Sequence, residues 1–168
     1  MDLARIIRTI GNSFHRPARH QWKPNAMASI NPLGLALLKE FEGLKLRAYL
    51  DSGNVWTCGY GHISGVGPHT TCTEELADKW LTQDLEVTES LVSHLVTVPL
   101  SSNQFSALVC FTFNEGAGHL KESTLLEKIN VRDFEGAANA ILLWDKCRGN
   151  VIQGLLRRRQ AERALFLA

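Results

Sequence analysis

The chain has 168 residues, of which 45% are hydrophobic and 21% are charged, and its formal net charge is +1. This length fits one domain, or a small lobe joined to a larger helical lobe, and the apolar content is enough for a buried core. There is no apolar run of about 18 residues, so we expect no transmembrane helix, and no secretory leader is visible.

Residues 1–26 differ in charge from the rest of the chain. They hold five Lys/Arg and one acid, for a local charge of +4, whereas residues 27–168 hold 13 Lys/Arg and 16 Asp/Glu, for −3. Four apolar residues share one face of a short helix here: Leu3, Ile6, Ile7 and Ile10. Such a basic amphipathic segment can bind anionic membranes or lipopolysaccharide. The alternative explanations are a disordered leader without function, or a true start of the protein at Met27. We divide the chain into an N-terminal extension, 1–26, and a domain, 27–168.

A helix is predicted to begin at Asn31-Pro32 and to end before Gly43. Asn is a favoured N-cap, Pro suits the first helical position, and Gly suits the position after the last turn. Glu42 therefore falls in the last turn, where the helix dipole is negative. That field would raise the pKa of a carboxyl group and suits a general acid.

A hairpin is predicted next, because residues 44–50 and 55–57 alternate about a turn at 52–54. Asp51 would begin the turn, and Thr57 would return near Glu42. Two carboxyl groups in different environments are what glycoside hydrolysis requires. The simpler explanation is that Asp favours turns and that Glu is common near helix ends.

The rest of the chain reads as helices. A capping box at residues 71–74 would start a helix over 74–94 with Leu76, Trp80, Val87 and Leu91 buried. Further helices fit 101–114, 122–130, 132–145 and 154–167, separated at 116–118, 130 and 148–150. Phe105, Leu108, Phe111 and Trp144 are expected in the core. With strands confined to 44–64, the predicted fold class is α+β, mostly α-helical.

The four cysteines are Cys58, Cys72, Cys110 and Cys147. They show no CxxC or Cys/His spacing, so we expect no metal, and no cofactor is indicated. Cys110 and Cys147 are predicted to be free thiols on apolar helix faces, and Cys58 to point into the packed face of the sheet. His62 is interpreted as a buried, hydrogen-bonded hinge residue. The disulfide state stays open.

The pattern Glu42-x8-Asp51-x5-Thr57, followed by the segment Cys58-Gly59-Tyr60-Gly61-His62, resembles the phage lysozyme family (glycoside hydrolase family 24). The resemblance continues through residues 111–118, 123–126, 144–146 and 154–166. It implies a lysozyme-like fold, in which a long helix joins a small sheet lobe to a larger helical lobe and the substrate cleft lies between them. One departure is Glu115, a third acid near the cleft.

The resemblance also implies residue roles. Glu42, Asp51 and Thr57 would be catalytic, and an Arg from the last helix would meet Glu42. The spacing to Phe166 suggests Arg158 among Arg157–Arg159, a run that could otherwise be a solvated helix face or a nucleic-acid patch. Substrate contacts would come from Ile63, Phe113, and Ser123 or Thr124.

The function so implied is that of an endolysin, which hydrolyses the β-1,4 bond between N-acetylmuramic acid and N-acetylglucosamine in peptidoglycan. The enzyme would be a monomer that binds no nucleic acid. It would stay in the host cytoplasm until a holin permits its release to the periplasm. We expect an inverting reaction; lytic transglycosylation is a chemical alternative. A second function is a lysozyme-like scaffold that mainly disrupts membranes or lipopolysaccharide through its basic arm.

Overall fold

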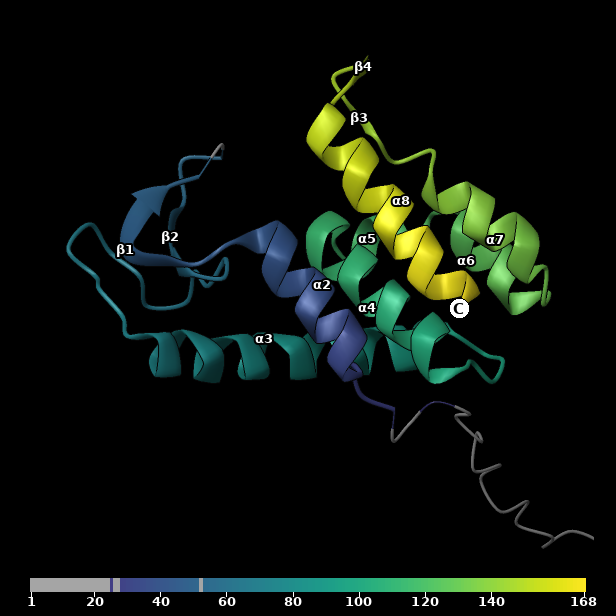
Figure 1. The fold of residues 1–168 in the computed structure, drawn as a ribbon, viewed down its shortest axis with the longest axis horizontal. Helices are drawn as coiled ribbons and strands as arrows, with labels where there is room; N and C mark the ends of the chain where they lie inside the picture. The colour runs from purple at the N-terminus through teal and green to yellow at the C-terminus, as the bar shows by residue number, and fades with distance from the viewer. Residues whose placement is uncertain (1–24, 26–27, 52) are drawn as a thin grey trace, which may run out of the picture.

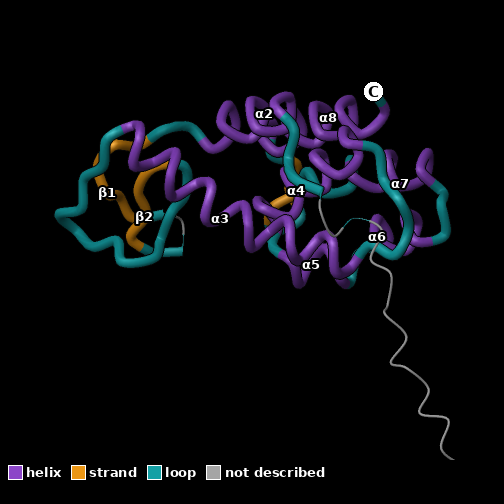
Figure 2. The backbone as a smooth tube through the Cα atoms, turned by 90° about the horizontal axis from the view of Figure 1, so that it is seen from below, coloured by secondary structure: helices purple, strands orange, loops and turns teal. Residues whose placement is uncertain are grey.

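The computed structural model describes residue 25, residues 28–51 and residues 53–168. A small lobe built around a β-hairpin lies at one end and a larger helical lobe at the other (Figure 1). Helix α3 (Glu74–Leu95) runs between the two lobes, as Figure 2 shows from a second direction. The helix expected within residues 1–26 lies outside the described residues.

The start of the domain follows the sequence prediction closely. Helix α2 (Pro32–Glu42) is capped by the Asn31 side chain, which accepts a hydrogen bond of 2.9 Å from the Gly34 N–H. It ends at Gly43, whose φ of +66° favours glycine. Strands β1 (Lys45–Leu50) and β2 (Trp56–Gly59) then pair antiparallel, with Tyr49 opposite Thr57.

The helical lobe is built around α4 (Ser102–Glu115), which is buried from Phe105 to Thr112. It packs against α2, α3 and α8 (Gln153–Leu167), so segments distant in sequence meet on one helix. Three short helices complete the lobe: α5 (Ala117–Lys121), α6 (Thr124–Asn130) and α7 (Phe134–Ile141). Phe105, Leu108 and Phe111 are buried and Trp144 packs partly buried against them, as predicted.

The buried face of α3 differs from the prediction. The residues facing the core are Ala77, Leu81, Leu85, Thr88 and Val92. Leu76, Val87 and Leu91 are exposed, and Trp80 is half-buried. Both sets fit a helical period, and two of the exposed residues, Val87 and Leu91, line a surface cavity instead of the core. The cap also differs, since Thr73 accepts from the Leu76 N–H.

Three further predictions of local structure are wrong. Residues 116–118 do not form a simple break, because α5 begins at Ala117. The helix predicted over 132–145 covers only Phe134–Ile141. Strands are not confined to 44–64, because β3 (Lys146–Cys147) and β4 (Asn150–Val151) form a second hairpin about Arg148 and Gly149, both at positive φ. Cys147 is therefore exposed on a strand and not on an apolar helix face.

The described part of the domain begins before Met27. Asn25 is buried, and its side chain donates to the Val98 carbonyl at 2.9 Å and accepts from the Leu100 N–H at 3.2 Å. Its carbonyl accepts from the Ser93 hydroxyl. A boundary between residues 26 and 27 would cut through these contacts, so we place Asn25 with the domain. Among the described helices, none is both long and apolar enough to span a bilayer.

Candidate active site

Glu42 is held at the end of α2 by an arginine from the last helix. Its Oε1 lies 2.8 Å from Arg158 Nη2, and its side chain is 18% exposed. Arg158 also lies over the Phe41 ring, 5.8 Å from the centroid. Arg157 is exposed and Arg159 pairs with Glu115, so Arg158 is the residue of this run that contacts Glu42.

Arg158 is buried but remains charged. Burial by itself lowers the pKa of Arg158, but the carboxylates of Glu42 and Glu162 outweigh it and raise that pKa above its ordinary value. Arg158 Nε donates to Glu162 Oε1 at 3.0 Å while Nη2 reaches Glu42. One planar guanidinium thus joins two carboxylates, which a compact ammonium group could not do with the same geometry.

Asp51 and Thr57 are held by the hairpin backbone. Asp51 Oδ1 accepts hydrogen bonds of 2.8 Å from the N–H groups of Gly53 and Val55. The Thr57 hydroxyl donates to the Val55 carbonyl at 3.0 Å, and Thr57 is buried. The turn-forming role of Asp51 is therefore real, and it fixes one carboxylate oxygen while the hairpin sets the side chain's position.

Tyr49 lies beside the candidate residues, and the sequence analysis did not single it out. It pairs with Thr57 across the hairpin, so the two side chains share one face of the sheet. Burial raises the pKa of Tyr49, and the charges of Glu42 and Asp51 raise it further. Both carboxyl groups thus act on this phenol. Strand alternation alone could not identify it, because its partner depends on a register that shifts between Lys45 and Tyr49.

Glu42 lines one cavity and lies near a residue of a second one. The larger, about 800 Å³, lies towards α8 and is lined by Glu42, Asn114 and Arg158 together with apolar residues such as Ile152 and Leu155. The second, about 360 Å³, is lined by Gly61, Ile63 and Phe113. At Gly61 an added Cβ would lie 3.8 Å from Glu42 Oε2 and 4.0 Å from the Phe113 ring, so the carboxyl group stands where the cavities approach one another.

The four expected substrate contacts lie in different parts of the structure. Ile63 and Phe113 come together in the second cavity from separate elements. Ser123 is buried as the N-cap of α6, where its hydroxyl accepts from the Leu126 N–H and donates to the Leu120 carbonyl. Thr124 is exposed beside it. Neither Ser123 nor Thr124 lines these two cavities.

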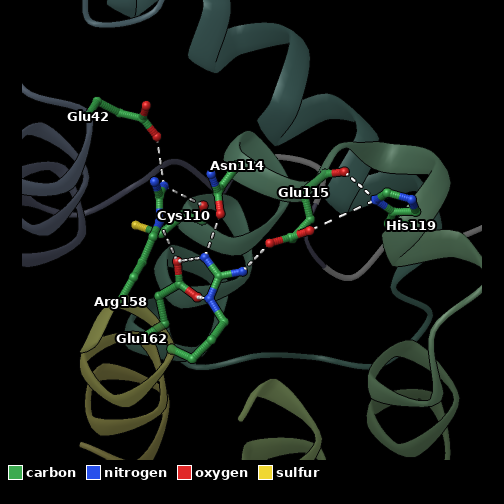
Figure 3. Close-up of polar contacts among 8 residues, drawn as sticks. Glu42, Cys110, Asn114, Glu115, His119, Arg158 and Glu162 are labelled. Atoms are coloured by element: carbon green, nitrogen blue, oxygen red, sulfur yellow. Dashed lines mark hydrogen bonds and ion pairs between the residues drawn. The ribbon is translucent and has the colours of Figure 1, made fainter. Parts of the chain in front are cut away.

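A network of buried charges lies behind Glu42 (Figure 3). Glu162 is fully buried, and its two oxygens contact Arg158 and Arg159 at 2.8–3.0 Å. Arg159 Nη1 then reaches Glu115 Oε1 at 2.7 Å. Glu115 is thus a partner of Arg159, and its side chain is 17% exposed. The network ends at the surface, where Glu115 Oε2 lies 3.9 Å from Nδ1 of His119.

Other polar side chains attach the small lobe to α3. His62 is buried, its Nδ1 lies 2.9 Å from Asp84 Oδ2, and its ring stacks on Trp80, as expected for a structural residue.

The thiols of Cys58 and Cys72 lie 3.4 Å apart and are free, and Cys58 is buried as predicted. Cys110 is a buried free thiol, also as predicted. Among the described residues there is no cluster of three or more side chains that could hold a metal ion.

Comparisons with known proteins identify relatives of this chain in sequence and in fold. The sequence pattern of the family described as "Phage lysozyme" matches residues 39–162. The endolysin of Salmonella phage P22 is 40% identical over 147 residues, which cover 84% of this chain and all of that protein. The endolysin of Bacillus phage B103 is 43% identical over 83% of this chain, but the chain spans only 54% of that relative. Among solved structures, the muramidase domain of SpmX from Asticaccaulis excentricus has a TM-score of 0.80 and 36% identity, covering 84% of this chain and 99% of that one.

Proposed function

The chain belongs to the phage lysozyme family and is a peptidoglycan-hydrolysing enzyme of the endolysin type, and we propose that Glu42 is the general acid of its reaction. The observation that carries the proposal is that Glu42 is mostly buried and yet lines the larger cavity, where its carboxyl group is accessible. A partly buried carboxyl group at a cleft is suited to proton donation. None of these findings supports the alternative of a mainly membrane-disrupting module.

We assign the reaction to the β-1,4 bond between N-acetylmuramic acid and N-acetylglucosamine. Glu42 gives its proton to the glycosidic oxygen as the bond to the muramic acid C1 breaks. A water molecule attacks C1, and Asp51 accepts its proton. Both backbone bonds to Asp51 end on Oδ1, so we assign Oδ2 to this water, and the Thr57 oxygen helps to orient it.

Product analysis tests the bond and the reaction class. Digestion of purified peptidoglycan followed by mass spectrometry should give reducing muramic acid ends. Anhydro-muramic ends would mean transglycosylation, in which no water attacks, and reducing N-acetylglucosamine ends would mean that the other glycosidic bond is cut. Both results would contradict the proposal.

We also propose inversion at the anomeric carbon, because Asp51 acts on water rather than as a nucleophile. Inverting enzymes hold their carboxyl groups roughly 6.5–9.5 Å apart, whereas retaining enzymes hold them about 5–5.5 Å apart. Proton NMR of the first-formed anomer distinguishes the two, and a retained configuration would reject inversion.

For substrate contacts we propose Ile63 and Phe113, and we keep Ser123 and Thr124 as weaker candidates on the α6 side. The shared cavity of Ile63 and Phe113 supports the first pair. Titration with a chitooligosaccharide, followed by NMR, should perturb both. Unperturbed signals from all four residues would reject this lining.

Residues 1–23 are proposed to add weak binding to anionic membrane or lipopolysaccharide. Each exposed Lys or Arg near such a surface contributes about 1 kcal/mol. Because Asn25 belongs to the fold, the matched variant lacks residues 1–23 and keeps Pro24 onwards. It should hydrolyse purified peptidoglycan at the full rate but lose salt-sensitive vesicle binding. Equal vesicle binding by both proteins would remove the role of the arm.

We further propose that the protein acts as a monomer and stays in the host cytoplasm until a holin opens the inner membrane. Retention of the enzyme in the cytoplasm of expressing cells, with lysis only after co-expression of a holin, would agree with this. Lysis without any permeabilising protein would contradict it.

A further inference from the structure

We propose that Glu162 is a positioning residue for this reaction: it competes with Glu42 for the guanidinium of Arg158, and so helps Glu42 to keep the proton that it donates. The inference rests on the proposed role of Glu42 as general acid. Glu162 touches no substrate, since it is fully buried, so it acts on the reaction indirectly, chiefly through Arg158.

The first step of the argument is geometric. Arg158 Nη2 lies 2.8 Å from Glu42 Oε1, and Arg158 Nε donates to Glu162 Oε1 at 3.0 Å. Glu162 stands one helical turn after Arg158, so the contact comes from the same face of α8. Because one cation is divided between two carboxylates, any change in one pair changes the other.

The second step is a count of charges. The cluster holds three carboxyl groups, Glu42, Glu115 and Glu162, and two guanidinium groups, Arg158 and Arg159. With all of them ionised the sum is −1, in surroundings of low polarity where an uncompensated charge is costly. One proton therefore stabilises the cluster, whose carboxyl groups compete for the same two cations, and Glu42 is the member of the three that lines the larger cavity.

The third step concerns how these groups titrate. Burial raises the pKa of Glu162 to about 7, although Arg159 and Arg158 act in the opposite direction. As the pH rises through that range, Glu162 gains negative charge and holds Arg158 more strongly. Less of that cation is then left to Glu42, as expected for coupled sites.

Several charged and titratable groups surround the cluster. They include Arg158 and Arg159 on α8, Cys110 and Glu115 on α4, Glu42 on α2, His119 on α5, and Tyr49 and Asp51 in the hairpin, and Glu40 and Arg157 line the same cavity as Glu42. Among them Glu162 alone contacts both arginines. Replacing it with a neutral side chain of the same shape is therefore the most direct test.

The experiment compares Glu162→Gln with wild type in the pH dependence of kcat/KM on soluble peptidoglycan fragments. Glutamine keeps the shape and one acceptor oxygen but removes the charge, so Arg158 would pair with Glu42 alone and favour its ionised form. We expect the alkaline limb of the profile to move about one pH unit lower. Above that limb kcat/KM should fall roughly tenfold, while at acidic pH it stays within about twofold of wild type.

Two other variants complete the test. Glu115→Gln removes a charge one cation further away and should shift the limb in the same direction by less, and it carries the test if Glu162→Gln does not fold. Glu135→Gln removes an exposed carboxylate from α7 and should leave the profile unchanged. Circular dichroism establishes which variants are folded.

The outcomes separate the two proposals. If Glu42→Gln keeps wild-type activity, the general-acid assignment fails, whatever Glu162→Gln does. If Glu42→Gln is inactive but the profiles of Glu162→Gln and Glu115→Gln coincide with wild type, the positioning role fails alone. Equal loss at every pH would also overturn it, because a merely structural residue would act in that way.

Discussion

The two sides of the proposed active site are held by different kinds of interaction. On the hairpin side, Asp51 and Thr57 are fixed by hydrogen bonds to backbone groups no more than four residues away. On the helical side, Glu42 is fixed by Arg158 from the last helix, and behind Arg158 stands a chain of buried charges. Local backbone bonds isolate a side chain from distant changes, whereas shared buried charges couple residues across elements.

The largest effect should come from Glu42→Gln, which removes the proton donor on the helical side. We expect kcat/KM on peptidoglycan to fall by a factor on the order of 10² to 10⁴, because this is the usual contribution of a positioned acid. The circular dichroism spectrum should be unchanged. Glu135→Gln, the exposed control on α7, should keep full activity. A Glu42→Gln enzyme that lyses at the wild-type rate would contradict the assignment.

On the hairpin side, Asp51→Asn and Asp51→Ala separate chemistry from structure. Asparagine can still accept the N–H groups of Gly53 and Val55 but cannot take a proton from water, so activity should fall about 10²-fold without loss of stability. Alanine also loses both hydrogen bonds, at about 1 kcal/mol each. Urea denaturation should therefore find only the alanine variant destabilised. An active asparagine variant would leave Asp51 with its turn role alone.

This contrast also explains what the sequence could predict. The cap at Asn31, the end of α2 at Gly43 and the turn at Asp51 depend on neighbouring residues, so local rules recover them. The α+β class follows from the same local elements.

The arrangement behind Glu42 could not be found in that way. The run Arg157–Arg159 could have been a solvated helix face, but Arg159 is buried because α4 supplies Asn114 and Glu115 as its partners. The phase of α3 was missed for a related reason. Apolar residues at two helical phases fit the period equally well, and only tertiary packing, against β2 as well as α4, selects Ala77, Leu81 and Leu85.

A smaller effect is expected from Arg158→Lys, which keeps the positive charge on the helical side but replaces the forked guanidinium with a single ammonium group. An ammonium group cannot hold Glu42 and Glu162 together with the geometry of Nη2 and Nε. We expect kcat to fall about tenfold and stability to fall by about 2 kcal/mol, since one buried carboxylate loses its contact. Arg157→Lys, on the exposed face of the same helix, should change stability by less than about 0.5 kcal/mol. Equal thermal unfolding of the two variants would show that the shared contact is unimportant.

The smallest effect on activity is expected from joining Cys58 to Cys72, which would add a covalent link to the hairpin side. The two sulfur atoms lie 3.4 Å apart and are separated by 14 positions in the chain. With oxidised glutathione as the oxidant, thiol–disulfide exchange would form one protein disulfide and release two molecules of reduced glutathione. Burial and the neighbouring Cys58 thiol raise the pKa of Cys72 to about 11. Because the thiolate is the reactive form, the rate should be low at pH 7 and rise roughly tenfold per pH unit towards pH 10.

Mass spectrometry of the Cys147→Ser protein, which lacks the exposed thiol, would follow this reaction without competing mixed disulfides. A bridge closing a loop of this size should stabilise the fold by up to about 3 kcal/mol in urea denaturation. The sulfur atoms are 3.4 Å apart, so we expect the strand carrying Thr57 to move little and activity to be nearly unchanged. Cys72→Ser in the same background should show neither the bridge nor the added stability.

A glutathione adduct on Cys72 without a bridge would mean that the side chains cannot rotate into bonding geometry. A large loss of activity on bridging would instead show that the hairpin side depends on freedom of its backbone as well as on its local hydrogen bonds.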